Sequence, residues 1–67
     1  MRVNAKKMLA LCADRGFQLK DLSRGACVSY RTLNAICRGK PVRVDTIGKL
    51  ARALKVNSIE LVEVTER

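Results

Sequence analysis

A short stretch near the middle of the chain carries side chains suited to reading another molecule. If residues 30–38 are wound as a helix of about 3.6 residues per turn, Arg31 and Ala35 lie opposite Leu33, and Asn34 flanks them. A guanidinium matches the hydrogen-bonding edge of guanine, an amide matches adenine, and a methyl group suits thymine. The pattern therefore indicates a helix that buries one face and presents base-reading groups on the other.

Basic residues surround this stretch and suit a polyanion. Arg38 ends it, Lys40 and Arg43 follow it, and Lys20 lies one segment earlier. The chain holds 14 Lys and Arg against 6 Asp and Glu, a formal net charge of +8. The excess lies before residue 56, because the residues from there on hold one basic and three acidic groups. This distribution is typical of a protein that binds a polyanion on one part of its surface.

The composition offers little for catalysis or for binding a metal. The chain has no histidine, and no Cys-x-x-Cys pair occurs among its three cysteines. A nucleophilic cysteine would need a base partner, and none is visible. We therefore expect no enzyme, no cofactor and no metal site. Because each cysteine has apolar neighbours in the sequence, we expect all three to be small buried hydrophobes: Cys12, Cys27 and Cys37.

Five short helical segments are predicted to position these groups. Apolar residues recur at helical spacing, Asn4 and Ser29 are suitable N-caps, and Gly16 and Gly39 are suitable stops. The segments run from about Asn4 to Arg15, Leu19 to Gly25, Tyr30 to Arg38 and Val44 to Lys55, and a last short turn begins near Ser58. The stretch from Leu61 to Thr65 could instead form a short strand. The sequence thus predicts one all-α domain over residues 1–67, with a short tail at 63–67.

The same spacing predicts which faces are buried. In the first segment the inward residues are Ala5, Met8, Leu9 and Cys12. In the fourth they are Val44, Ile47, Leu50, Ala51 and Leu54. A small residue, Ser23, lets the second and third segments approach closely, and Val28 in the turn fills the gap between them. These helices should pack around one core.

The order and spacing of several short motifs resemble the phage repressor and Cro family, the XRE-like group of helix-turn-helix proteins. The motifs are Asp21-Leu22-Ser23, Val28-Ser29, Thr32-Leu33, Gly39-Lys40 and the run from Asp45 to Leu54. The resemblance implies a compact five-helix, lambda-repressor-like fold with its helix-turn-helix at about residues 19–38. One departure is Cys27, which stands where the family usually has a left-handed glycine.

The resemblance also implies a function, namely operator binding by a transcriptional regulator, most often a repressor. The third helix would lie in the major groove of double-stranded DNA. Its base-reading residues would be Tyr30, Arg31, Asn34 and Ala35. The phosphate-binding residues would be Lys20, Ser29, Thr32, Arg38, Lys40 and Arg43. We expect a homodimer on DNA, joined through the end of the fourth helix, the last turn and the Leu61–Thr65 segment.

Two other binding functions compete with this one. A small domain of this shape could bind a protein partner, as the antitoxin of a toxin–antitoxin pair does. A basic membrane-surface peptide would want aromatic anchors, but the chain has no Trp and one Phe. No run approaches the roughly 18 apolar residues of a membrane span, and no signal peptide is visible. We therefore expect a cytoplasmic protein that does not bind membranes.

Overall fold

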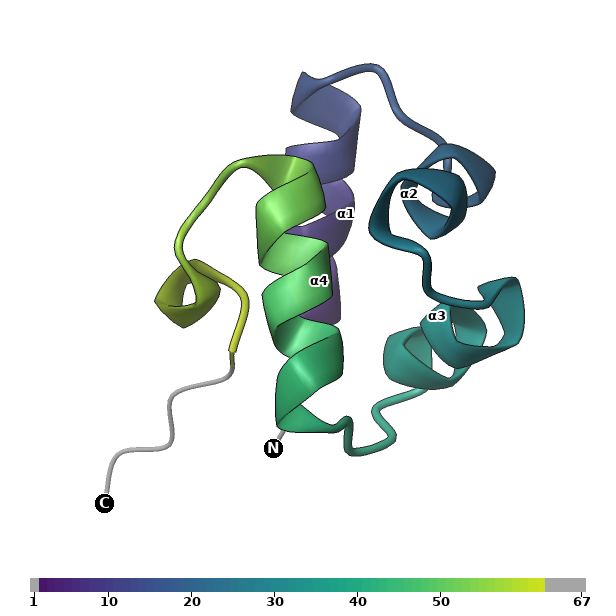
Figure 1. Cartoon of the computed structure of the whole chain (residues 1–67), viewed down its shortest axis with the longest axis vertical. Coiled ribbons are helices and arrows are strands. Elements are labelled where there is room, and N and C mark those ends of the chain that lie inside the picture. Colours follow the sequence, from purple (N-terminus) through teal and green to yellow (C-terminus); the bar gives the residue numbers. More distant parts are fainter. Residues whose placement is uncertain (1, 63–67) are drawn as a thin grey trace.

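The computed structural model describes residues 2–62, and in that range it contains four α-helices and one short 3-10 turn. These elements are α1 (Ala5–Asp14), α2 (Leu19–Ala26), α3 (Tyr30–Cys37), α4 (Val44–Leu54) and η1 (Ser58–Glu60). In Figure 1, α4 runs along the middle of the molecule, with α2 and α3 on one side and η1 on the other. Helix α4 packs against both α2 and η1, and α2 packs against α3. The predicted all-helical architecture is confirmed for these residues.

The predicted fifth helix is wrong, because Ser58–Glu60 forms a single 3-10 turn. The N–H of Glu60 donates to the carbonyl of Asn57 at 2.9 Å, and the N–H of Leu61 donates to the carbonyl of Ser58 at 2.9 Å. The chain then turns inward, because the side chain of Leu61 is fully buried in the core. The helical turn ends there, and Val62 pairs with Val3.

The end of the described chain is held against its beginning. The N–H of Asn4 donates to the carbonyl of Leu61 at 2.6 Å, and Val62 forms an isolated antiparallel bridge with Val3. The possible terminal strand can be compared with the structure only at Leu61 and Val62. The rest of that stretch, and the predicted tail, lie outside the described residues.

Local capping explains where the helices begin and end. At the start of α1, the N–H of Lys7 donates to the Asn4 side-chain oxygen at 3.1 Å, as the sequence predicted. Both α1 and α3 are followed by a glycine in the left-handed region, with φ of +69° at Gly16 and +86° at Gly39. Glycine adopts this conformation without the clash that a Cβ atom causes. These stops free the chain to change direction into α2 and α4.

The core is continuous and apolar, and every helix contributes to it. No buried polar or charged residue occurs within residues 2–62. The fully buried large side chains are Met8, Leu22, Leu33, Ile36, Leu50, Leu54 and Leu61. Burial of this kind stabilises the fold by about 1.5–3 kcal/mol for each large apolar side chain. Helix α3 is therefore held in place by the same core as the other helices.

Several predictions of burial are wrong at the edges of the core. Leu9 is 42% exposed and Val44 is 70% exposed. Leu9 lies beside the inward row formed by Met8 and Cys12, and Val44 begins α4 beyond the last buried turn at Ile47. Helical spacing identified the correct faces, but it could not tell how far along each face the neighbouring helix extends.

The prediction that all three cysteines are buried is confirmed only for Cys12. Cys27 and Cys37 are exposed, and all three thiols are free. Cys27 follows α2, and Cys37 is the last residue of α3, so both lie where a helix leaves the core. Burial raises the pKa of the Cys12 thiol, an effect that Arg15 opposes and Cys37 reinforces. Within residues 2–62, no helix is long and apolar enough to cross a membrane.

Candidate nucleic-acid interface

A tight turn fixes the angle between α2 and α3. The Ser23 hydroxyl donates to the carbonyl of Val28 at 2.6 Å, and the N–H of Val28 donates to the carbonyl of Ser23 at 3.1 Å. Val28 is buried in the core, as the sequence predicted. Between them, Cys27 has φ of 57° and ψ of 41°, in the left-handed region. The turn thus keeps the geometry that glycine would favour, although a cysteine occupies it.

Helix α3 begins with the predicted serine cap. The N–H of Thr32 donates to the Ser29 hydroxyl oxygen at 3.1 Å, and the two hydroxyl oxygens lie 2.8 Å apart. The inner face of the helix buries Leu33 and Ile36 in the core. Its outer face is therefore fixed by packing and cannot rotate away from solvent.

The outer face of α3 borders an open hollow of about 400 Å³. The hollow is lined by Tyr30, Arg31, Asn34, Ala35, Arg38 and Lys40. All four side chains predicted to read bases therefore share one surface, together with two of the predicted phosphate-binding residues. Arg31 and Arg38 are exposed, and Asn34 and Ala35 are half-buried. We call this surface the α3 hollow.

A second hollow of about 390 Å³ lies on the α4 side of the α3 hollow, and Arg31 and Ala35 border both. Thr32 and Arg43 also line it, with Thr46 at the start of α4. This surface, the α4-side hollow, brings in two more of the predicted phosphate-binding residues. The Thr32 hydroxyl is partnered by Ser29, and the positive charge of this hollow comes from Arg43 together with Arg31.

Arg43 does not present an isolated charge. Its Nε atom lies 3.6 Å from Oδ1 of Asp45, and both side chains are largely exposed. An exposed pair of this kind is worth at most about 1 kcal/mol, because water screens both charges. The guanidinium can therefore exchange this partner for another anion at small cost.

A third hollow, of about 500 Å³, lies on the α2 side and is lined by Lys20, Ser23, Arg24 and Tyr30. Tyr30 borders both this surface, the α2-side hollow, and the α3 hollow. Lys20 was predicted to bind phosphate, whereas Arg24 was not among the predicted residues. The two cations lie four residues apart, a spacing that places both on one face of α2.

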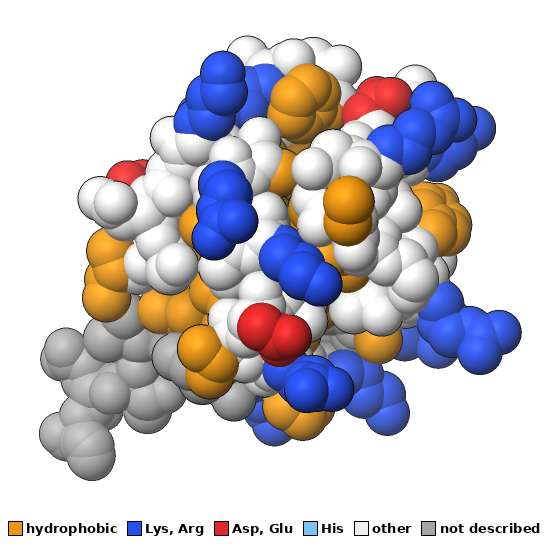
Figure 2. Space-filling view, in the orientation of Figure 1, with side chains coloured by type: hydrophobic (Ala, Val, Ile, Leu, Met, Phe, Trp, Pro, Cys, Tyr) orange, Lys and Arg blue, Asp and Glu red, His pale blue; other side chains and the backbone are white. Residues whose placement is uncertain are grey.

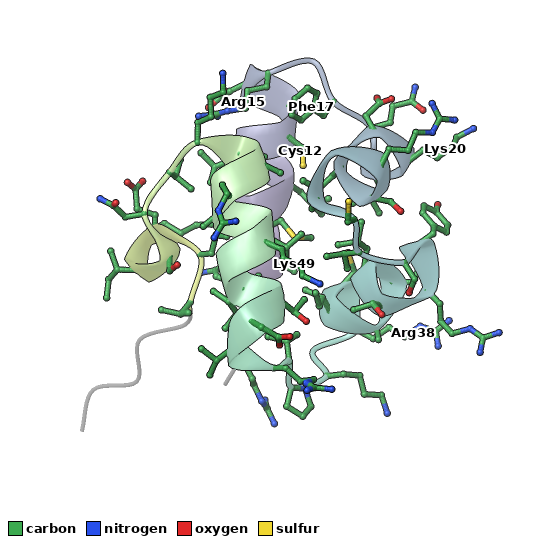
Figure 3. The ribbon with its side chains drawn as sticks, viewed as in Figure 1. Cys12, Arg15, Phe17, Lys20, Arg38 and Lys49 are labelled. Carbon is green, nitrogen blue, oxygen red and sulfur yellow. The ribbon has the colours of Figure 1, made fainter. Side chains whose placement is uncertain are left out.

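Basic side chains border the side of the molecule formed by α2 and α3. Figure 2 shows Lys and Arg side chains along this edge, and others over α4 in the middle of the view. In Figure 3, Lys20 from α2 and Arg38 from α3 both extend outward from this side. Ser29 borders none of the three hollows, so its hydroxyl acts here as a helix cap. Within residues 2–62, no group of three or more metal-ligating side chains lies together.

One comparison with known proteins agrees with this arrangement. A family model described as "Cro/C1-type HTH DNA-binding domain" matches residues 7–66. The matched range contains all of α2, α3 and α4 and most of α1. Searches of curated proteins and of solved structures found no match.

Proposed function

Since the chain belongs to the Cro/C1-type helix-turn-helix family of DNA-binding domains, we propose that it binds specific sites in duplex DNA and represses transcription by occupying promoters. The observation that carries this proposal is the α3 hollow. It gathers a guanidinium, an amide and a methyl group, from Arg31, Asn34 and Ala35, on the outer face of one rigid helix. Three such groups at fixed spacing can distinguish base pairs in the major groove.

The proposed contacts divide into base reading and backbone positioning. Arg31 would donate two hydrogen bonds to guanine, and Asn34 would pair with adenine. The methyl group of Ala35 would pack against thymine. Phosphates on either side would be held by cations at the borders of the hollows: Lys20, Arg38, Lys40 and Arg43.

Selection of binding sites from a random duplex library tests this function. We expect enrichment of one sequence motif at about physiological salt, with Arg31→Ala losing preference at a single base position. If the library yields no motif and binding disappears as salt rises, the charge provides only non-specific attraction. A protein partner, such as the toxin of a toxin–antitoxin pair, would then be the better explanation.

We further propose that the chain binds DNA as a homodimer, so that the enriched motif is an inverted repeat with half-sites about one helical turn apart. An exposed apolar surface supports this. Val44 is 70% exposed, Ile59 is 67% exposed, and both line a hollow of about 220 Å³ with Ile47, Ser58 and Val62. Leu61, which the sequence placed at the dimer interface, is instead part of the core.

Sedimentation with and without DNA tests the dimer. We expect two copies for each inverted repeat, and we expect Ile59→Asp to reduce binding to the paired site far more than to an isolated half-site. Ile59 is suitable because its exposed side chain can be changed without disturbing the core. A monomer both free and on the paired site would contradict the proposal.

A further inference from the structure

Helix α2 carries two cations that the base-reading surface does not use. Lys20 and Arg24 lie four residues apart, and both line the α2-side hollow with Tyr30. Both side chains are exposed, and within residues 2–62 neither forms an ion pair. Asp21 lies between them in the sequence, but its Oδ2 atom accepts the N–H of Gln18 at 2.8 Å. The hollow therefore concentrates positive charge that no nearby carboxylate neutralises by direct contact.

We propose that Arg24, with Lys20 and Tyr30, forms a clamp for one backbone phosphate of the DNA, beside the half-site that α3 reads. This inference rests on the proposed function, because it takes α3 to lie in the major groove. It assigns a phosphate ligand to Arg24. It also changes the expected role of Tyr30 from reading a base to contacting the backbone beside the bases.

The width of the major groove explains why the ligand is a phosphate. The groove is about 12 Å wide, and a helix with its side chains is about 10–12 Å across, so one helix fills it. With α3 in the groove, α2 must lie over the sugar–phosphate backbone at its edge. The cations on α2 then face phosphate oxygens, because the base edges are already covered by α3.

Of the polar side chains around the α2-side hollow, one is already hydrogen-bonded within the protein and three can donate to a ligand. The Ser23 hydroxyl donates to the Val28 carbonyl at 2.6 Å, so its proton is not available to the ligand. The remaining donors are the ammonium of Lys20, the guanidinium of Arg24 and the hydroxyl of Tyr30. A guanidinium and an ammonium together suit a phosphate oxygen pair better than a neutral base edge.

Salt titrations of binding to an operator and to a scrambled duplex test the clamp. A lost phosphate contact lowers the slope of log K against log salt by about 0.9, which corresponds to about fivefold weaker binding near 0.15 M salt. We expect Arg24→Ala to show this loss equally on both duplexes. The matched control is Arg52→Ala, which removes the same charge from α4 at a hollow that shares no residue with the three around α3.

Ethylation of single backbone phosphates locates the contact. The wild-type protein should fail to bind when one particular phosphate flanking the half-site is ethylated, and Arg24→Ala should no longer be sensitive to that phosphate. Tyr30→Phe should weaken both duplexes alike, without changing base preference.

The outcomes separate this inference from the proposed function. If Arg24→Ala matches Arg52→Ala in affinity and slope, the clamp is wrong even when the operator is bound selectively. If Arg24→Ala changes base preference instead, Arg24 reads a base and the clamp is also wrong. If the wild type binds both duplexes equally, sequence-specific function fails, yet the salt slopes of Arg24→Ala and Arg52→Ala still decide whether Arg24 contacts a phosphate. If the wild type binds no duplex, both proposals fall.

Discussion

Ser23 and Val28 exchange two hydrogen bonds across the turn between α2 and α3. The Ser23 hydroxyl donates to the Val28 carbonyl at 2.6 Å, and the Val28 N–H donates to the Ser23 carbonyl at 3.1 Å. The bond from the Val28 N–H closes the end of α2. The bond from the Ser23 hydroxyl satisfies the Val28 carbonyl, which accepts no hydrogen bond from α3. Because Val28 is also buried, backbone and side chain together set the position of α3 relative to α2.

We expect Ser23→Ala to lower the free energy of unfolding by about 1–2 kcal/mol. The substitution leaves the part-buried Val28 carbonyl without its hydroxyl partner, and the loss of such a bond typically costs this amount. Urea denaturation followed by circular dichroism measures it. The control is Ser58→Ala, at an exposed serine whose side chain makes no hydrogen bond within residues 2–62. Equal midpoints for the two variants would show that the Ser23 hydroxyl contributes nothing.

The turn itself shows where sequence reasoning succeeds and where it fails. The small residue at Ser23 and the apolar residue at Val28 were enough to predict a close approach of two helices. The hydroxyl bond was not predictable, because any small residue would satisfy the same spacing. The left-handed conformation of Cys27 could be expected only from the resemblance, since a Cβ atom disfavours that region.

We expect Cys27→Gly to raise the free energy of unfolding by about 0.5–1 kcal/mol. A Cβ atom in the left-handed region costs about 1–2 kcal/mol, and the greater freedom of glycine in the unfolded chain returns part of that gain. Thermal unfolding monitored by circular dichroism measures the change. Cys27→Ala, which keeps a Cβ atom, should show little of it. A destabilised Cys27→Gly protein would mean that the cysteine side chain makes a favourable contact that outweighs the strain.

We expect Arg31→Ala and Lys40→Ala to weaken DNA binding in different ways. Loss of a guanidinium that reads guanine costs about 1–3 kcal/mol on the operator and relaxes preference at one base pair. Loss of a phosphate contact at Lys40 weakens all sequences alike and lowers the salt slope by about 1. Fluorescence anisotropy with operator and scrambled duplexes distinguishes the two effects. Identical, sequence-blind losses would remove Arg31 from the base-reading set.

The candidate interface was predictable to the extent that it lies on one helix. Arg31, Asn34 and Ala35 share the outer face of α3 because helical spacing dictates it, and the α3 hollow confirms that they lie together. Arg24 was not predicted, although Lys20 on the same helix was. The proximity of Arg24 to Tyr30 depends on the angle between α2 and α3, which the core and the turn determine and the spacing of residues does not.

We expect the free energy of unfolding to fall as the pH rises above 9.0, the ordinary pKa of a cysteine thiol. Burial raises the pKa of Cys12 in the folded protein, so the unfolded thiol ionises first and unfolding releases a proton. The stabilisation is present below the unfolded pKa and is lost above it, by at most about 1.4 kcal/mol per pH unit. Denaturation at pH 8 to 10.5, compared with Cys12→Ala, isolates this contribution. Parallel pH profiles for the two proteins would contradict it.

Thiol labelling tests the burial of Cys12 in a second way. Cys27 and Cys37 are exposed and should react promptly with a thiol reagent in the folded protein, whereas buried Cys12 should react only as the protein opens. The double variant Cys27→Ser and Cys37→Ser leaves Cys12 as the only thiol. Its labelling should therefore accelerate strongly in urea. Immediate labelling of this variant without urea would mean that α1 does not protect the thiol.

We expect Asp45→Asn to tighten DNA binding by about 0.2–1 kcal/mol on every sequence. The carboxylate lies 3.6 Å from Nε of Arg43, so it competes with phosphate for that guanidinium and repels the DNA backbone. The same carboxylate lies in the first turn of α4, where a negative charge stabilises a helix, so the variant should lose about 0.3–1 kcal/mol of folding stability. Asp14→Asn removes an equal charge at the end of α1, away from all three hollows, and serves as the control in anisotropy titrations. If Asp45→Asn and Asp14→Asn tighten binding equally, the gain reflects net charge alone. Asp45 would then not compete with a DNA phosphate for the Arg43 guanidinium.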